Sequence, residues 1–286
     1  MIKSIKNLNM IELREKSIKW GLGIINAVFV LVPESFFLKI NSKIKLLSNG
    51  PDELKVILIR ILISIIIIIL VAVIIAIVLT HRKSVQIKGH NYCIQIEYGN
   101  ILEMTSCKKV IPFDECFSTH VGEYPSDIKP NSICGQYLKA YPIQDIEMQE
   151  LIDAAQLKPL NSKSKYKKKV RYESGKLVPR EDYLLMAFAK LDDIGRGELT
   201  REELLDGLSM LWKEIDTYYG QKDICIPILG SGITRIKGES LTQQQLLDLI
   251  IASYKLSSHK IKFPYKLRIV CKGHEDFSLN KIGENI

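Results

Sequence analysis

The residues best suited to chemistry lie in the stretch ILGSGITRIKG, residues 228–238, which begins at the end of the apolar run 223–229. Gly230 and Gly232 can adopt positive φ and let a ligand approach the backbone, so that consecutive N–H groups point into one concavity. Near the first two glycines, the side-chain donors are two hydroxyls and a guanidinium, on Ser231, Thr234 and Arg235. Such a set of donors suits a diphosphate, whose oxygens accept charge-assisted hydrogen bonds.

The same glycines are also consistent with an ordinary turn that binds nothing. Two common nucleotide-binding fingerprints do not fit, because no Gly-Lys-Ser/Thr follows and Gly238 comes too late to complete a GxGxxG pattern. The loop by itself therefore leaves both a tight turn and a phosphate site open.

A second glycine-containing stretch, DDIGRGELTREE at residues 192–203, has the length of a calcium-binding loop. Its third and fifth places hold Ile194 and Arg196, where calcium requires oxygen ligands, and an arginine there would repel the ion. We interpret the stretch as a turn followed by a helix, with Thr200 as the N-cap and Glu203 as its capping-box partner. We expect no metal site.

The elements that must position the glycine loop have the pattern of a mixed α/β domain over residues 85–286. Apolar or alternating runs predict strands, and helical periodicity predicts helices. The expected strands cover residues 92–98, 108–113, 168–173, 176–179, 223–229 and 265–271, and the expected helices cover residues 181–192, 201–219 and 242–256. Ser174 and Gly175 are predicted to form a hairpin turn between the third and fourth strands.

The last two predicted helices flank the strand 223–229, and another strand follows them. This βαβ order predicts a largely parallel sheet covered by helices. The glycine loop then lies at the carboxyl end of a parallel strand, where open α/β sheets bind ligands, and leads into a helix capped at Ser240 or Thr242.

The opposite half of the chain contains a long apolar segment. Residues 61–79 are nineteen consecutive uncharged residues, sixteen of them Ile, Leu or Val. With residues 56–60 they would form a helix about 36 Å long, enough for a hydrocarbon core of about 30 Å. Arg60 lies near the segment end and can extend toward the membrane surface. We therefore expect a transmembrane helix.

Residues 20–38 form a weaker apolar segment, interrupted by Asn26, Pro33 and Glu34. We expect a second span here, with an interfacial helix as the alternative. The predicted organisation is a cytosolic segment 1–17, a membrane hairpin 18–84 with spans at about 18–38 and 56–80, and a ligand-binding domain 85–286. Lys and Arg number five before the apolar segment 20–38 and three just after the second span, against four in the connector. This bias places both termini and the domain in the cytoplasm.

The formal charge of +8 and pI of about 9.0 fit an anionic membrane surface or a nucleic acid. Much of the excess lies in the run 158–171, which is typical of a solvated loop and contains Tyr166 as its only aromatic residue. We therefore expect no nucleic-acid partner. The six cysteines show neither a CxxC pair nor histidines at metal-ligand spacing, which favours reduced thiols in the cytosol.

Several motifs together carry a family resemblance: QIEYGNILEM after the first long strand, VIPFDECFSTHVG followed by SICGQYL, AFAKLD, and LWKEID with ICIPILGSGITR. With the apolar hairpin, they resemble the transmembrane-macro effector family (type II ThsA) of the bacterial Thoeris antiphage defence system. That family joins a divergent macro domain to two transmembrane helices, and the resemblance covers nearly the whole chain.

The resemblance implies a macro-domain-like fold that binds an ADP-ribose-derived signal. A TIR-domain enzyme would make the signal from NAD, and histidine-ADP-ribose is the expected conjugate. Ligand binding would assemble the effector into a homo-oligomer that disrupts the inner membrane and causes abortive infection. The resemblance implies a sensor without a catalytic residue or cofactor.

The resemblance also implies which residues bind the ligand. Gly99, Asn100 and Ile101 match the Gly-Asp-Ile of macro domains, whose acid holds the adenine amino group; Asn100 can accept that bond without charge. The first ligand loop contributes Phe113, Asp114, Glu115, Phe117, Ser118 and Thr119 and lacks the common NAAN…GGG signature. The second loop, which cups the diphosphate and distal ribose, contributes Gly230, Ser231, Gly232, Ile233, Thr234 and Arg235.

Two other functions are compatible with the residues. One is a membrane-tethered ADP-ribosyl hydrolase or ADP-ribose-binding module, for which His120, Asp114 and Glu115 are the nearby acid and base candidates. The other is a scaffold whose basic run 163–171 binds nucleic acid or anionic lipid.

Overall fold

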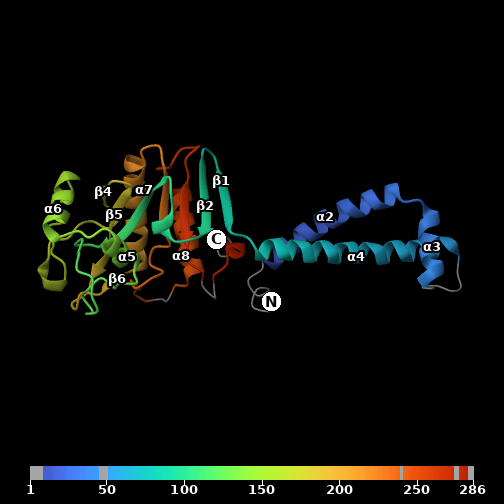
Figure 1. Cartoon of the computed structure of the whole chain (residues 1–286), viewed down its shortest axis with the longest axis horizontal. Coiled ribbons are helices and arrows are strands. Elements are labelled where there is room, and N and C mark those ends of the chain that lie inside the picture. Colours follow the sequence, from blue (N-terminus) through green and yellow to red (C-terminus); the bar gives the residue numbers. More distant parts are fainter. Residues whose placement is uncertain (1–8, 45–50, 239–240, 274–276, 283–286) are drawn as a thin grey trace. The chain divides into compact units, whose positions relative to one another are not determined.

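The structure is a computed structural model that describes residues 9–44, 51–238, 241–273 and 277–282. The chain divides into two compact units, Met1–Arg82 and Lys83–Ile286. Both are drawn in Figure 1. The first eight residues of the predicted N-terminal segment, part of the predicted connector and the candidate cap Ser240 lie outside the described residues.

The first unit is helical, with helices α2 (Met10–Leu31), α3 (Glu34–Ile44) and α4 (Asp52–Thr80). Helix α2 begins after Asn9, whose side chain accepts a hydrogen bond from the Glu12 N–H at 2.9 Å. Helices α2 and α3 meet at a bend of 102°. The predicted span 18–38 therefore crosses a break, because Pro33 has no N–H to continue the helix and favours an extended Val32 before it.

Helix α4 is 29 residues long and apolar enough to cross a membrane. Among the described residues, the bent pair α2 and α3 would add a second span if the two helices were counted as one. Helix α2 packs against α4 through its buried residues Ser17, Gly21 and Ile25. Near the bend, Phe37 packs with Val56 and Ile59.

The second unit contains a nine-stranded mixed sheet in the order β1-β2-β9-β7-β3-β5-β6-β8, with β4 paired to β5. Five pairs are parallel (β2 with β9, β9 with β7, β7 with β3, β3 with β5, and β6 with β8) and three are antiparallel. The strands are β1 (Ser84–Gly89), β2 (Tyr92–Tyr98), β3 (Cys107–Asp114), β4 (Leu177–Arg180), β5 (Tyr183–Leu191), β6 (Gly197–Leu199), β7 (Asp223–Pro227), β8 (Arg235–Ile236) and β9 (Leu267–Cys271). The prediction of a mixed, largely parallel sheet is confirmed.

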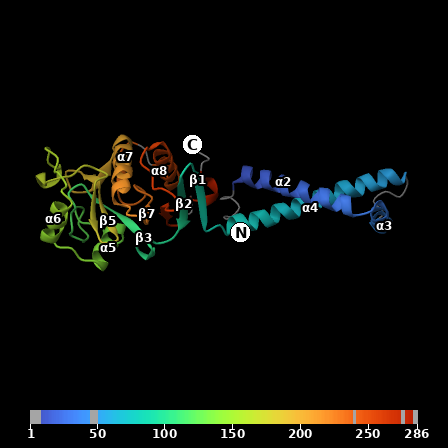
Figure 2. The same ribbon diagram turned by 90° about the horizontal axis from the view of Figure 1, so that it is seen from above.

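Helices cover both faces of this sheet, as Figure 2 shows. They are α5 (Ile133–Ala140), α6 (Asp145–Ala154), α7 (Arg201–Tyr218) and α8 (Gln243–Leu256); short 3-10 helices are η1 (Ile101–Glu103), η2 (Tyr166–Lys168) and η3 (Leu279–Lys281). Leu184 and Phe188 of β5 join the core under α7 and α8, and Leu185 and Ala187 join the core under α5 and α6. The sheet is thus the middle layer of three.

The prediction of a helix over residues 181–192 is wrong, because the segment forms strand β5. Leu, Met and Ala favour helices in isolation, but burial on both faces of a sheet also produces a continuous apolar run without alternation. Seven of the nine β5 residues are buried in succession, from Tyr183 to Ala189. Tertiary packing therefore overrides the local helical preference.

The prediction of a strand over residues 168–173 is also wrong. The segment begins at the end of η2 and continues as a loop. Tyr172 is buried beside Phe117, but Val170 is exposed, so the segment lacks the alternating buried residues of a strand. The predicted hairpin at Ser174 and Gly175 is accordingly wrong as well. The turn exists, but β4 pairs with β5 instead.

The predicted βαβ unit around the glycine loop is present, since β7 and β9 are parallel neighbours joined through α8. Thr242 caps α8 by accepting a hydrogen bond from the Gln245 N–H, and Thr200 caps α7 in a capping box with Glu203. In the stretch that has the length of a calcium loop, the Asp192 carboxylate accepts hydrogen bonds from the Arg196 N–H at 2.8 Å and from Arg196 Nε at 2.8 Å.

Candidate ligand-binding site

A cavity of about 690 Å³ opens at the carboxyl ends of β3, β5, β7 and β9. Small-molecule sites usually measure about 300–1,000 Å³, and open α/β sheets bind their ligands at this edge. The remaining walls come from residues 125–134, 195–197, 228–235 and 272–273, together with Gln243. The cavity lies entirely within the second unit.

The glycine loop forms one wall of this cavity. Gly230 has a φ of +81°, as its predicted role requires, whereas Gly232 lies outside the left-handed region and has open space around its Cβ position. The Ser231 N–H and hydroxyl both donate to the Ile228 carbonyl, at 3.3 and 2.6 Å. Among the described residues, four N–H groups of the loop donate to no protein acceptor: those of Gly230, Gly232, Ile233 and Thr234.

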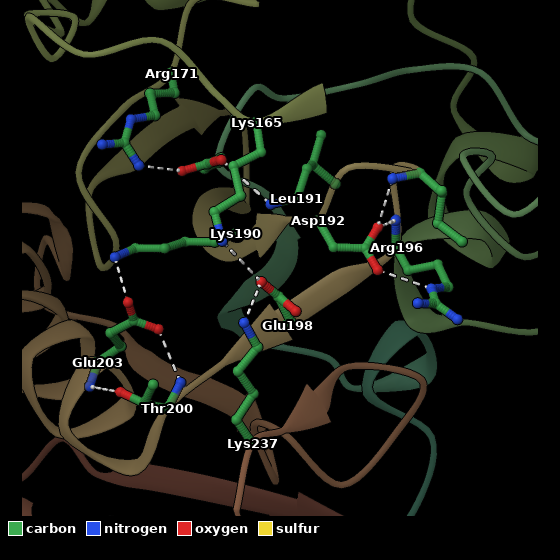
Figure 3. A network of polar contacts seen from close by, with 12 residues as sticks. Lys165, Arg171, Lys190, Leu191, Asp192, Arg196, Glu198, Thr200, Glu203 and Lys237 are labelled. Carbon is green, nitrogen blue, oxygen red and sulfur yellow. Dashed lines mark hydrogen bonds and ion pairs between the residues drawn. The ribbon is translucent and has the colours of Figure 1, made fainter. Parts of the chain in front are cut away.

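The charged side chains of the wall favour an anion. Four cationic residues and two carboxylates line the cavity: Lys129, Arg196, Arg235 and Lys272, with Asp114 and Asp127. Arg196 is paired with Asp192 (Figure 3), and Lys129 Nζ donates to two backbone carbonyls. Arg235 is exposed, and no described residue pairs with its guanidinium. That group is available for an anionic ligand.

The opposite wall contains residues that the sequence analysis did not assign. Ser132 caps α5 by accepting a hydrogen bond from the Gly135 N–H at 2.9 Å. A Cβ at Gly135 would lie 2.1 Å from the Lys129 carbonyl oxygen, so only glycine allows this approach of the loop to the helix. The signal in the sequence was a serine before an apolar run with a glycine three residues later, in SICGQYL.

The predicted first ligand loop has its backbone N–H groups engaged internally. The Asp114 carboxylate accepts hydrogen bonds from the N–H groups of Cys116 and Ser118, at 2.8 and 3.2 Å. The Glu115 N–H donates to the Ala189 carbonyl at 2.8 Å, and the Phe117 N–H donates to the Asp114 carbonyl at 3.2 Å. Unlike the glycine loop, this loop presents no row of unpaired amides. Of its predicted ligand residues, only Phe113 and Asp114 line the cavity.

The other four residues of that loop make structural contacts. Glu115 is buried, and its carboxylate pairs with Arg171 at 3.1 Å and accepts a hydrogen bond from the Leu191 N–H at 3.2 Å; Figure 3 draws both partners. Phe117 is buried beside Phe113. The Thr119 hydroxyl donates to the Asp145 carboxylate, and Lys169 Nζ donates to the Ser118 hydroxyl.

The residues predicted to hold adenine lie beside the cavity without lining it. Asn100 caps η1, with its amide oxygen accepting from the Leu102 N–H at 3.2 Å and its amide nitrogen donating to Glu103 at 2.9 Å. Ile101 packs with Val270, a residue that does line the cavity. The exposed Gly99 donates its N–H to the Cys271 carbonyl. The adenine contact through Asn100 stays a prediction.

Comparison with known protein families shows to which family the chain belongs. Residues 94–272 match the family model described as Thoeris protein ThsA, Macro domain. The chain belongs to the ThsA macro-domain family. This match confirms the resemblance to the Thoeris effectors and agrees with the three-layer α/β architecture.

This ThsA macro domain is similar to a Thoeris protein in sequence and to solved macrodomains in structure. Thoeris protein ThsA of Bacillus amyloliquefaciens (strain Y2) is 31% identical over 195 residues, which cover 65% of this chain and 65% of that protein, just under two thirds of each. The Oceanobacillus iheyensis macrodomain with ADP is 10% identical with a TM-score of 0.46, covering 69% of this chain and 93% of the other. The macrodomain of Thermus aquaticus DarG is 13% identical with a TM-score of 0.37, and the match covers 63% of this chain and 98% of that chain.

The ThsA macro domain should show a pH dependence that originates at Asp114. Burial raises the pKa of the Asp114 carboxyl above its ordinary value, so its stabilising contribution is present below the unfolded-state pKa and lost as pH rises through the folded-state pKa. In Asp114→Asn the amide oxygen can keep the bonds to the Cys116 and Ser118 N–H groups. We expect the variant to gain stability relative to the wild type as pH rises above the ordinary pKa of an aspartate, about 4. Urea unfolding of residues 83–286 measures the difference, and a constant difference at every pH would contradict the assignment.

Proposed function

We propose that this chain is a membrane-anchored antiphage effector whose macro domain senses an ADP-ribose-derived signal. Family membership supports the antiphage role, and the signal would be supplied by a TIR-domain enzyme. The observation that carries the ligand assignment is the set of four unpaired N–H groups in the glycine loop beside the unpaired guanidinium of Arg235. Such groups bind a diphosphate with fixed geometry and complementary charge.

The cavity suits the remainder of such a ligand. Its apolar lining includes Phe113, Ile133 and Val270, next to the segment Gly99–Ile101 that the family resemblance assigns to adenine. The other cationic residues of the cavity wall, Lys129, Arg196 and Lys272, offer contacts for a polar conjugate such as the histidine of histidine-ADP-ribose. A ligand of this shape would cross the cavity with its diphosphate at the glycine loop.

The arrangement of acids and bases favours a sensor over a hydrolase. The Glu115 carboxylate pairs with Arg171 and accepts a hydrogen bond from the Leu191 N–H. The Asp114 carboxylate accepts hydrogen bonds from the Cys116 and Ser118 N–H groups and so stabilises its own loop. His120 is largely exposed and faces Asp127 at 4.0 Å. General acid–base catalysis requires a group within hydrogen-bond reach of the reacting atom and with a suitable pKa. We therefore propose signal binding without turnover, and incubation with an ADP-ribosylated protein should release no ADP-ribose.

Ligand binding would act on the membrane through assembly of the chain. The apolar helix α4 supports anchoring in a membrane. The excess of Lys and Arg at the ends of the hairpin favours a macro domain in the cytoplasm, with the inner membrane as the anchor site. A ligand that binds only the assembled state contributes about 2.7 kcal/mol per site at 100 times its Kd. Several sites in one homo-oligomer would then suffice to switch assembly, and with it membrane disruption and abortive infection.

Calorimetry of residues 83–286 with ADP-ribose and with its histidine conjugate tests the ligand assignment. Arg235→Ala should weaken binding about tenfold or more, because hydrogen bonds to charged groups contribute about 1.5–3 kcal/mol. Lys237→Ala is the matched control, since it removes the same charge two residues away, where the side chain pairs with Glu198 and does not line the cavity. No heat with either ligand would refute the proposal, and equal losses in the two variants would remove Arg235 from the site.

A further inference from the structure

Helix α2 carries a polar stripe on the side that faces away from α4. The α2 residues buried against α4 are Ser17, Gly21 and Ile25, spaced four apart along one side of the helix. At 3.6 residues per turn, a second set of residues falls on the opposite side. This polar stripe consists of Glu15, Lys19, Gly23 and Asn26. Just before it, Glu12 pairs with Lys16 at 2.6 Å and with Arg82 at 2.9 Å.

Along the helix axis, the polar stripe lies at the level of the most apolar part of α4, although it faces away from that helix. A Cβ at Gly21 would lie 3.1 Å from Ile68, and Glu12 pairs with Arg82 at 2.9 Å. The α2 residues between Glu12 and Gly21 therefore lie alongside residues 68–82, the last part of α4 and the two residues after it. Residues 61–80 of α4 contain no charge and measure about 30 Å as a helix, the thickness of a hydrocarbon core. When α4 spans the membrane, Glu15 and Lys19 lie at the depth of the lipid tails.

Lipid is an unfavourable surrounding for these side chains. Glu15, Lys19 and Asn26 are exposed, and none has a partner among the described residues. Ionisable residues inside membranes almost always face a bundle interior or a water-filled cavity. The side chains flanking the stripe differ, because Trp20, Leu22 and Ile24 of α2 are exposed and apolar. The hairpin thus has surfaces suited to lipid and one surface that is not.

The polar stripe is complementary to itself. It holds one acid and one base, Glu15 and Lys19, which lie one helical turn apart. Neighbouring copies of one chain can therefore place an acid of one stripe near a base of the next, while the lipid-facing sides stay apolar. A second copy of this chain fits the stripe better than a partner with a strongly charged surface, because the formal charges of the stripe cancel.

We propose that several copies of the hairpin assemble with their polar stripes turned inward around a water-filled lumen, and that this lumen conducts ions. The inference rests on the proposed function, which requires membrane insertion and ligand-driven assembly. It makes the membrane lesion a defined pore lined by α2. A general disruption of the bilayer would not depend on which side of α2 is altered.

Current measurements on the full chain in planar bilayers, with ADP-ribose or its histidine conjugate added, test the pore. Lys19→Glu should raise the permeability of K⁺ relative to Cl⁻ several-fold, because it converts a ring of positive charge into a negative one. Asn26→Cys should conduct as the wild type does until a membrane-impermeant anionic thiosulfonate reagent is added, and the reagent should then reduce the current. Ile24→Cys is the matched control on a lipid-facing side, and its current should not change.

The outcomes separate the pore from the proposed function. Absence of any ligand-dependent current in the wild type would overturn the proposed effector function, and the pore with it. A ligand-dependent current that responds equally to the reagent in Asn26→Cys, Ile24→Cys and the unsubstituted chain would overturn the pore alone. The cysteine variants keep the test decisive if Lys19→Glu fails to insert, because they introduce no charge before modification.

Discussion

Replacing Gly232 by glutamate should abolish binding of ADP-ribose, whereas alanine at the same position should leave binding almost unchanged. No atom lies within 4 Å of the Cβ position at Gly232, and its φ lies outside the left-handed region, so a side chain fits without strain. The glutamate carboxylate would stand beside the unpaired N–H groups that we assign to the diphosphate. Like charges brought together at a binding site cost several kcal/mol, which corresponds to a loss of more than about 100-fold.

Calorimetry on the two variants measures this difference, with urea unfolding as a check that both remain folded. Gly232→Ala retains the unpaired amides and adds only a methyl group, so a change of less than about threefold is expected. Equal loss in both variants would mean that backbone freedom at this position matters more than charge. Unimpaired binding by Gly232→Glu would show that the diphosphate lies elsewhere in the cavity.

Removing the carboxylate of Glu115 should destabilise the macro domain more than removing any exposed ion-pair partner. Its side chain is 3% exposed, and it pairs with Arg171 at 3.1 Å while accepting a hydrogen bond from the Leu191 N–H. Glu115→Ala leaves the buried Leu191 N–H without its acceptor, and it leaves the largely buried Arg171 guanidinium without a counter-charge and with hydrogen bonds to Ser162 alone. Breaking a buried ion pair in this way costs about 3–5 kcal/mol of unfolding free energy.

Urea unfolding of residues 83–286 measures this cost. Glu147→Ala provides the control, because Glu147 pairs with Arg180 at 2.9 Å with its side chain 43% exposed. Solvent screens that pair, so a loss of about 1 kcal/mol or less is expected. Similar losses in the two variants would show that burial adds nothing at Glu115. Weakened ligand binding by a stably folded Glu115→Ala would return the residue to the ligand site.

Local signals identified the glycine loop and its flanking elements correctly. The apolar run before the loop, the positive φ of Gly230 and the cap at Thr242 each depend on neighbouring residues, so their effect is visible in a short stretch. The same reasoning failed at β5, where burial on both faces imitates the apolar content of a helix. It also missed α5, which is only eight residues long and is positioned by the contact of Gly135 with the backbone of Lys129.

The amino-acid sequence by itself determined the apolar helix α4, the βαβ unit around the glycine loop and the family to which the chain belongs. These features arise from composition and from interactions between residues close in the chain. Only the tertiary structure decided that amides of the loop at Gly230 have no acceptor in the described part of the chain, while those of Glu115 to Ser118 in the loop at Asp114 donate internally. It also decided that Glu115 holds the core and that the polar side of α2 turns away from α4. The physical reason is that a hydrogen-bond acceptor or a packing partner can come from any part of the chain, and only the folded arrangement selects which one is near.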